Sequence, residues 1–280
     1  MRPIKILVDS TCDLPKEYLE KNDVSTVALS LSFNEDTYKD GVNLSVEELY
    51  DLVDKKKVLP KTAALTTHEL IQEFKKWVDE YDVFFISISS GFSSSFQNAY
   101  IAAQEFDGKV VAFDSKNLSS GIGLLICKAI EIRNSGVSLK ELEEKLNYYV
   151  PRVRSQFAVE TLDYLYKGGR CSSLVFIFGK GFHIRPIIRV KDGKMMVYRK
   201  PRGKMQKALD ELVNIFKEDL PNMELDRVMI THSLADESCK YLHEQLLKYI
   251  PEEKIMITRA GCIISSHCGQ GCIGILYIVK

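Results

Sequence analysis

The sequence predicts an α/β protein in two parts: an N-terminal parallel α/β/α domain over residues 1–150 and a C-terminal α+β domain with a mixed sheet over residues 151–280. Strand-like runs alternate with helical patterns through the first half, which is typical of a parallel sheet covered on both faces. This alternation ends at Pro151, after the last of these helices. In the second half, Asp192-Gly193 lies between two apolar runs, which indicates an antiparallel hairpin.

The first half divides into four expected strands and six expected helices. The strands are short apolar runs rich in β-branched and aromatic residues, and the helices are longer segments with apolar residues three and four positions apart. We expect strands over residues 4–8, 26–33, 83–87 and 109–113, and helices over residues 15–22, 46–56, 67–81, 94–106, 119–134 and 139–149.

The second half begins with the expected hairpin over residues 186–198. Two helical patterns follow, and each leads into an apolar strand. We expect helices over residues 204–218 and 235–249, strands over residues 227–231 and 254–259, and a closing strand over residues 273–279.

Composition excludes several classes of function. The 280 residues are 45% hydrophobic and 27% charged, and 38 basic residues balance 38 acidic ones, so net charge favours neither nucleic acid nor an anionic membrane surface as a partner. No apolar run approaches the roughly 18 residues of a membrane span, and the N-terminus lacks an apolar signal region. We therefore expect a cytoplasmic protein without stable membrane insertion. Seven scattered cysteines are typical of reduced thiols.

A hydroxyl-rich turn over residues 87–95, here called the serine turn, reads Ser-Ile-Ser-Ser-Gly-Phe-Ser-Ser-Ser. It lies between a buried strand and a helix, so unpaired backbone N–H groups, a helix dipole and several hydroxyls meet at one point. That combination suits a carboxylate or a phosphate. The alternative is that the serines only cap the helix.

Polar residues also follow two other strands of the expected sheet. Asp9-Ser10 and Asp114-Ser115 each come directly after an apolar run, as the serine turn does. In open parallel sheets, ligands bind beyond the carboxyl ends of the strands. The sequence therefore predicts a polar site at this edge of the sheet.

Two other motifs near the C-terminus are weaker. Cys262, His267, Cys268 and Cys272 suggest a zinc site, but their spacing matches no paired Cys-x-x-Cys ligands, and we expect no metal. Residues 269–274 fit the G-x-G-x-x-G pattern of dinucleotide-binding folds. Only six strand-like residues follow, so the required helix and acidic residue cannot be present, and the glycines more simply allow close backbone approach around His267.

A hydrolase is a further alternative. Gly91-Phe92-Ser93 resembles a nucleophile elbow, although its fifth position is Ser95 instead of glycine. The residue types would allow a catalytic triad of Ser93 with His267 and either Asp163 or Asp226, but no spacing favours either aspartate.

Several segments, taken together and in this order, resemble the DegV family, and within it the bacterial fatty-acid-binding proteins of the FakB type. The resemblance runs from end to end of the chain. The segments are residues 9–15 (DSTCDLP), Lys61-Thr62, residues 89–99 (SSGFSSSFQNA), 114–116 (DSK), 160–170 (ETLDYLYKGGR) and 267–271 (HCGQG).

The resemblance implies a two-domain DegV-like fold that buries one long-chain fatty acid in a tunnel, with the carboxyl group held where the domains meet. It implies a carrier without cofactors that is not itself an enzyme. A separate fatty acid kinase would phosphorylate the carboxylate with ATP, and the acyl phosphate would enter phospholipid synthesis. The expected partners are therefore the fatty acid and the kinase, with no nucleic acid, and we expect a monomer.

The resemblance also implies roles for individual residues. Thr62 and Ser93 would donate hydrogen bonds to the carboxylate and His267 would support them, which agrees with the need of a buried carboxylate for donors that replace water. Around these three, the resemblance places Ser94, Gly91 and Ser266. Arg170 and Arg202 would contact the kinase or the phosphate, although a solvated basic loop is the alternative for both.

The chain departs from the family pattern at two places. Ala63-Ala64-Leu65-Thr66 follows Thr62 where many relatives have Ser-Gln-Pro-Ser, and Cys268 follows His267 where threonine is more usual. These changes leave open an altered lipid preference.

The acyl chain needs an apolar wall, and each candidate for it is equally well explained as ordinary core. The candidates are residues 174–178, Phe92, Phe96, Ile122 and Leu125, with His183 at the mouth. Two other classes of function stay open: an enzyme that uses Ser93 on a phosphorylated or acylated metabolite, and a lipid-sensing regulatory module.

Overall fold

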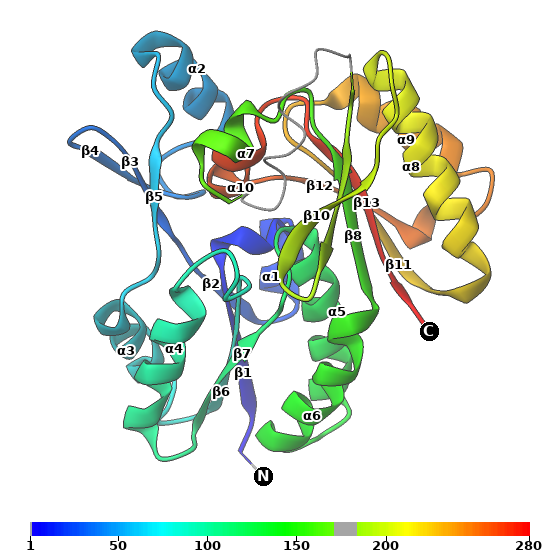
Figure 1. Cartoon of the computed structure of the whole chain (residues 1–280). Helices are drawn as coiled ribbons and strands as arrows, with labels where there is room; N and C mark the ends of the chain where they lie inside the picture. Colours follow the sequence, from blue (N-terminus) through cyan, green and yellow to red (C-terminus); the bar gives the residue numbers. More distant parts are fainter. Residues whose placement is uncertain (1, 171–183) are drawn as a thin grey trace.

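The computed structural model describes residues 2–170 and 184–280, and a parallel four-stranded sheet forms its N-terminal part (Figure 1). The strand order is β2-β1-β6-β7, and all three pairings are parallel, as the alternating sequence pattern predicts. The strands are β1 Ile4–Asp9, β2 Val24–Val27, β6 Asp82–Ser87 and β7 Val110–Asp114.

Helices cover both faces of this sheet because successive strand residues are apolar and point to opposite sides. Ile6 and Phe84 pack with α5 (Ser120–Asn134) and α6 (Leu139–Tyr149). Leu7 and Phe85 pack with α3 (Thr67–Lys75) and α4 (Ser95–Ala103). Helix α1 (Lys16–Lys21) connects β1 to β2, and α2 (Val46–Lys56) lies in the long segment between β2 and β6.

Three helices begin where the sequence predicts because a capping box fixes each start. Ser45, Thr66 and Ser138 each accept a hydrogen bond from the backbone N–H three residues later, and the glutamate at that position bonds back to the cap. This reciprocal pair satisfies backbone donors that the first helical turn leaves free.

The C-terminal sheet has six strands in the order β10-β9-β8-β13-β11-β12. Only β11 and β12 are parallel, so the sheet is mixed, as predicted. Asp192 and Gly193 both have positive φ at the tip of the β9–β10 hairpin, which is the geometry expected for a two-residue turn. The strands are β8 Val153–Ala158, β9 Ile187–Lys191, β10 Lys194–Arg199, β11 Met223–His232, β12 Ile255–Arg259 and β13 Ile273–Val279.

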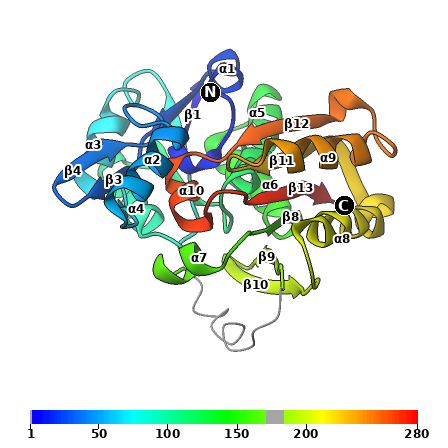
Figure 2. The ribbon, with the colours of Figure 1, turned by 90° about the horizontal axis from the view of Figure 1, so that it is seen from above.

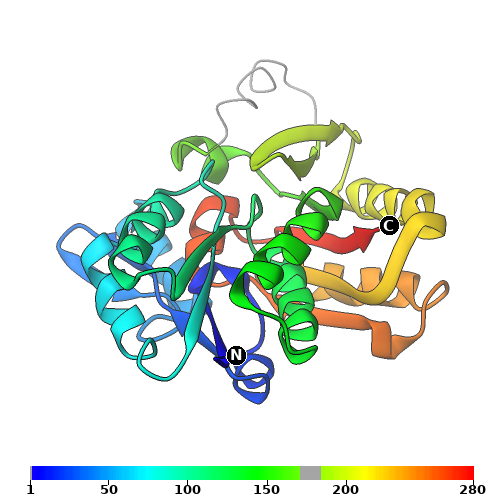
Figure 3. The same ribbon diagram turned by 90° about the horizontal axis from the view of Figure 1, so that it is seen from below.

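Helix α5 joins the two halves. It contacts β1 and β6 on one side and β8, β11 and β13 on the other, and it lies between the two sheets (Figure 3). Eleven of its 15 residues are buried, which a helix that faces water on one side would not show. The outer face of the C-terminal sheet packs against α8 (Met205–Asp219) and α9 (Asp236–Leu246). The boundary between residues 150 and 151 falls after α6, and the division into two domains stays a prediction.

The strand expected over residues 26–33 is wrong: it is two strands in different sheets. β2 ends at Val27, and β3 (Ser30–Phe33) belongs to a small antiparallel sheet with β4 (Asp36–Lys39) and β5 (Lys61–Ala63). The strand pairing is interrupted at Leu29, whose N–H donates to Ser10 Oγ at 3.2 Å instead of to a neighbouring strand. Both strands contribute buried apolar residues, so the apolar pattern continues through the interruption.

Several short elements were not predicted. β8 was missed because Arg154, Ser155 and Gln156 interrupt its apolar pattern, and α7 (Asp163–Lys167) and α10 (Cys262–Cys268) are too short to show a helical period. The helix expected over residues 67–81 ends at Lys75 and continues as turns. Short 3₁₀ turns occupy Ser10–Cys12, Gln104–Phe106, Val150–Arg152, Leu220–Asn222 and Glu252–Lys254. Within the described ranges, no helix has both the length and the hydropathy needed to cross a membrane.

Candidate ligand-binding site

Two adjoining cavities lie where the halves of the molecule meet. The first, here called the head cavity, opens beside the serine turn, β5 and α10. The second, the inner cavity, extends between the C-terminal sheet and the start of α5, and it shares Leu118, Met195, Ile264 and His267 with the first. The head cavity is lined by Leu29, Thr62, Ala63, Ala64, Ile88, Phe92, Ser93, Ser94, Leu118, Arg170, Met195, Ile263, Ile264 and His267.

The wall of the inner cavity is almost entirely apolar, although it includes several hydroxyl-bearing residues. Their hydroxyls are turned toward polar partners: Thr231 Oγ1 lies 2.7 Å from Ser120 Oγ, and Ser155 Oγ donates to Asn117 Oδ1 at 2.6 Å. What reaches the cavity is therefore chiefly carbon and sulfur. Besides the four shared residues, its wall contains Ser119, Ser155, Phe157, Leu165, Thr231, His232, Ser233, Ala260, Cys268, Cys272, Gly274 and Leu276.

Thr62 and His267 meet at the boundary between the cavities although 205 residues separate them. Thr62 lies on β5, opposite Leu31 of β3, and His267 lies near the end of α10. Thr62 Oγ1 is 3.0 Å from His267 Nε2, a hydrogen-bond distance.

His267 is neutral at physiological pH. Burial lowers its pKa to about 4, and the positive charge of Arg170 contributes to the shift. Nδ1 is buried and has no hydrogen-bond partner among residues 2–170 and 184–280, and it lies so close to Gly168 that a Cβ there would be 2.3 Å away. An unpaired buried acceptor is less unusual than an unpaired donor, which favours the proton on Nε2. His267 then donates to Thr62 Oγ1, and the hydroxyl proton of Thr62 is available to a ligand.

The serine turn combines capping with exposed donors. Ser93 Oγ accepts from the N–H of Ser95 at 3.2 Å and lies 3.0 Å from Ser95 Oγ, so it takes part in the start of α4. Ser94 makes no capping bond with its side chain and lines the head cavity. The first intrahelical bond runs from Asn98 to Ser94, so the N–H groups of the first turn are directed out of the helix near this cavity.

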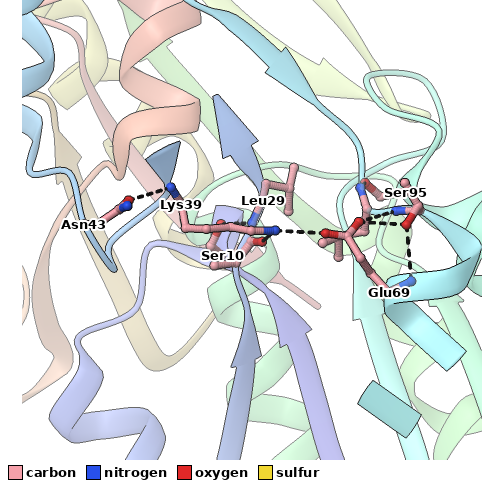
Figure 4. Close-up of polar contacts among 9 residues, drawn as sticks. Ser10, Leu29, Lys39, Asn43, Glu69 and Ser95 are labelled. Atoms are coloured by element: carbon pink, nitrogen blue, oxygen red, sulfur yellow. Dashed lines mark hydrogen bonds and ion pairs between the residues drawn. The ribbon is translucent and has the colours of Figure 1, made fainter. Parts of the chain in front are cut away.

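The loop after Thr62 is held from two sides. Ser95 Oγ accepts from the N–H of Leu65 at 3.2 Å, and Asn98 Nδ2 donates to the carbonyl of Leu65 at 2.7 Å. On the other side, Lys39 Nζ lies 2.9 Å from Glu69 of the α3 capping box (Figure 4). α4 therefore positions Thr62 relative to Ser93, a role of Ser95 and Asn98 that their place in the sequence did not reveal.

Two buried carboxyl groups anchor the start of α10, the helix that carries His267. Asp13 Oδ1 accepts from the N–H of Gly261 at 2.8 Å, and Asp40 Oδ1 accepts from the N–H of Cys262 at 2.7 Å. Burial raises the pKa of both carboxyl groups, and the hydrogen bonds partly offset this effect. The helix lies beside α7 at the junction of the two halves (Figure 2).

The tip of the β9–β10 hairpin rests on the serine turn. Ser89 Oγ donates to the carbonyl of Gly193 at 3.1 Å, and a Cβ on Gly91 would lie 2.2 Å from that oxygen. Gly91 thus permits a close approach and does not line the head cavity. Met195, on the same hairpin, forms part of both cavity walls.

Of the other expected site residues, some line the head cavity and others do not. Arg170 lines the head cavity, and its guanidinium donates to the carbonyl of Gly168 at 2.8 Å. Arg202 is exposed and does not line it. Ser266 is buried, and its hydroxyl donates to Ile263 of its own helix at 2.8 Å, so the structure does not bring it to the cavity. Of the expected apolar wall residues, Phe92 lines the head cavity.

Three further wall candidates, Phe96, Ile122 and Leu125, do not line either cavity. Ile122 and Leu125 are fully buried core residues, and Phe96 packs on Tyr100. Residues 174–178 and His183 lie outside the described residues. Phe157 was missed because it belongs to the unpredicted strand β8.

The alternative sites are not assembled within the described residues. Ser93 bonds to Ser95, His267 bonds to Thr62, and Asp226 forms an ion pair with Lys128 at 2.6 Å, so no triad links them. No group of three or more potential metal ligands occurs across residues 2–170 and 184–280, and Cys262 donates its thiol to a backbone carbonyl.

The glycine pattern at residues 269–274 leads into strand β13, not into a helix. Gly269 instead allows the ring of Tyr164 to approach, since a Cβ would lie 2.9 Å from it. The other two glycines of the pattern, Gly271 and Gly274, lie against Glu160 and Gln156, and the glycine that lies against His267 itself is Gly168.

The same architecture occurs in known proteins. A family model described as "Uncharacterised protein, DegV family" matches residues 3–280. The chain belongs to the DegV family. Among similar DegV domain-containing proteins, one from Clostridium acetobutylicum is 32% identical over 282 residues and one from Clostridium perfringens is 33% identical over 287 residues. The alignment covers 100% of both chains in the first case and 99% of both in the second.

Solved structures of DegV proteins share the fold along the whole chain. A fatty-acid-binding DegV protein from Thermus thermophilus has a TM-score of 0.92 at 26% identity, and DegV of Bacillus subtilis, a fatty-acid-binding protein, has 0.88 at 28%; both alignments cover 100% of each chain. A stearic-acid-binding protein from Eubacterium ventriosum has a TM-score of 0.85 at 29% identity, with 99% of this chain and 98% of that chain covered. The predicted fold, a parallel N-terminal sheet with a mixed C-terminal sheet, is confirmed.

Proposed function

We propose that this DegV family protein binds one long-chain fatty acid, with the carboxylate in the head cavity and the acyl chain in the inner cavity. The observation that carries the proposal is the Thr62–His267 pair at the boundary between the two cavities, with Ser93 on the wall of the outer one. Three solved relatives at 26–29% identity that bind fatty acids support it.

The chemistry of the two cavities suits the two ends of such a ligand. A carboxylate that leaves water loses several kcal/mol unless hydrogen-bond donors replace its hydration. Thr62 and Ser93 offer hydroxyl donors, and the first turn of α4 offers backbone N–H groups. The acyl chain needs no specific partner, because each methylene buried in the inner cavity contributes about 0.8 kcal/mol.

We further propose that the protein is a cytoplasmic, monomeric carrier that presents the carboxylate to a fatty acid kinase. A carboxylate oxygen would attack the γ-phosphorus of ATP, the bond to ADP would break, and the acyl phosphate would go on to phospholipid synthesis. Arg170 is exposed at the wall of the head cavity, and Arg202 is exposed on the same half of the chain. Both would contact the kinase or the transferred phosphate, which their charge favours.

Mass spectrometry of the purified protein, first native and then denatured, tests the binding proposal. We expect a stoichiometric fatty acid in the native protein. Thr62→Val and Ser93→Ala should each weaken fatty acid binding by about 10- to 150-fold, the effect of removing one hydrogen bond to a charged group. Thr62→Ser, which keeps the hydroxyl, and Thr37→Val, on the exposed strand β4, should retain the ligand.

A protein that carries no lipid and refuses added fatty acids would overturn the proposal. Adding a fatty acid kinase and ATP to the loaded protein tests the second step. We expect acyl phosphate to form, and Arg202→Glu should slow it without releasing the bound fatty acid. A protein that holds the lipid but never supports phosphorylation would instead be a lipid-sensing module.

A further inference from the structure

The inner cavity runs along three neighbouring strands of the C-terminal sheet, β8, β13 and β11 (Figure 1). Alternate residues of a strand face the same side, and β13 contributes Gly274 and Leu276 to the wall, with Cys272 just before the strand. Gly274 presents no side chain, so a ligand can lie against the backbone there. Leu276 is therefore the first side chain of β13 that a ligand meets as it extends away from His267.

The cavity stops at the level of Leu276 on β13 and on β11. The next residue of β13 on this face, Ile278, is buried but does not line the cavity. On β11, Thr231 pairs with Gly274 and lines the cavity. Met229, which pairs with Leu276, is fully buried and does not line it.

Strand β8, on the other side of β13, shows the same limit. Ser155 pairs with Leu276 and lines the cavity. Val153, which pairs with Ile278, is buried and does not line it. Among the described residues, the register of three strands thus places the end of the cavity at one level, and Leu276 is the central residue of that level.

Helix α5 closes the sheet face beyond this level. It contacts all three strands, yet none of its residues Ser120–Asn134 lines the inner cavity. Near its start, Ser155 Oγ donates to Asn117 Oδ1 at 2.6 Å, and a Cβ on Gly121 would lie 2.4 Å from Ser155 Oγ. The hydroxyl of Ser155 is therefore satisfied and covered, and the helix leaves no space behind it.

We propose that Leu276 forms the end wall of the acyl-chain site and sets the longest fatty acid that the protein holds. The inference rests on the proposed function, in which the inner cavity contains the acyl chain. Each methylene that fits should increase affinity about fourfold, because its burial contributes about 0.8 kcal/mol. A longer chain must displace the closely packed core behind Leu276 or withdraw its carboxylate from Thr62, so affinity falls beyond an optimum length.

Competition among fatty acids tests this proposal on the full chain. Each protein is incubated with an equimolar excess of saturated fatty acids of every length from about 12 to about 20 carbons, and the bound acids are extracted and quantified by mass spectrometry. Leu276→Ala removes three carbons from the end wall. We expect its optimum to lie about two carbons above that of the native protein, with the ratio of the longer acid to the native optimum raised about tenfold or more.

Ile278→Ala is the matched control. It removes three carbons from a buried side chain on the same face of the same strand, two residues beyond the cavity, and should leave the optimum unchanged. Leu276→Val and Ile278→Val, which remove one carbon each, replace this pair if either alanine variant fails to fold. The expected shift for Leu276→Val is then about one carbon.

A longer optimum in the Leu276 variant alone supports the proposal. An unchanged optimum in that variant, or an equal shift in the Ile278 variant, overturns it while the bound acids leave the proposed function standing. A native protein that takes up none of the acids contradicts the proposed function itself, and this inference with it.

Discussion

Gly91→Ala tests the contact between the β9–β10 hairpin and the serine turn. A Cβ at this position would lie 2.2 Å from the carbonyl oxygen of Gly193 and 3.2 Å from its carbonyl carbon. Both atoms belong to the backbone of a tight turn, so no side chain can rotate away. The hairpin tip must therefore move by about 1 Å to restore van der Waals separation.

The cost follows from that displacement. Ser89 Oγ lies 3.1 Å from the same carbonyl, and a shift of this size breaks the hydrogen bond, which contributes about 0.5–1.5 kcal/mol. Overpacking adds about 1–3 kcal/mol. Gly91 does not have positive φ, so alanine incurs no backbone strain and regains about 0.4–1 kcal/mol through the unfolded chain. We expect a net loss of about 1–3.5 kcal/mol in the free energy of unfolding.

Urea denaturation measures this loss, and a thermal scan should show a fall in Tm of about 2–6 °C. Ser94→Ala is the matched control, since Ser94 is exposed in the same turn and makes no capping bond. It should change stability by less than about 0.5 kcal/mol. Equal stability of Gly91→Ala and the native protein would refute the reasoning, because the hairpin tip could not then rest on the turn.

Three further predictions follow from the hydrogen bonds and pKa shifts around the site. His267 has a pKa lowered to about 4, so the unfolded chain takes up the proton first, and stability present above pH 6.5 is lost as the pH falls toward 4. Between pH 7 and pH 5, the free energy of unfolding measured in urea should fall by up to about 2 kcal/mol more for the native protein than for His267→Gln. Equal falls in the two proteins would contradict this. Ser95→Ala leaves the buried N–H of Leu65 unpaired and should cost about 1–3 kcal/mol in the same assay; a neutral effect would show that the loop after Thr62 is held without it. Burial raises the pKa of Asp13, so its contribution to stability is largest at low pH and is lost as the pH rises through that pKa. The free energy of unfolding of Asp13→Asn, minus that of the native protein, should therefore be higher at pH 7 than at pH 4. The opposite order in urea titrations would contradict this prediction.

Local signals predicted much of the framework. Capping boxes at Ser45, Thr66 and Ser138 fix three helix starts to the residue, because the cap and its partner lie three residues apart in the chain. The Asp192-Gly193 turn identifies the hairpin because both residues tolerate positive φ. Such features need no information from distant parts of the sequence.

The errors in the framework arise where tertiary contacts override local pattern. The break at Leu29 depends on a hydrogen bond to Ser10, which no apolar periodicity reports. β8 is a central strand that contains Arg154 and Gln156, and it is stable there because it pairs with β9 and β13. Its neighbours, not its own composition, make it a strand.

The sequence alone determined the class of fold, the family and the residue types suited to a carboxylate. The serine turn and the glycine-flanked His267 are local motifs, and their chemistry can be read from a few adjacent residues. The family resemblance also placed Ser266 around the carboxylate ligands, although its hydroxyl is directed to its own helix.

Only the tertiary structure decided which of these residues meet. Three contacts join segments that are 30 to 205 residues apart in the chain: the Thr62–His267 hydrogen bond, the hydrogen bond between Ser95 and Leu65, and the close contact between Gly91 and Gly193. Hydrogen bonds and charge act over a few ångströms in space, and distance along the chain does not report distance in the fold.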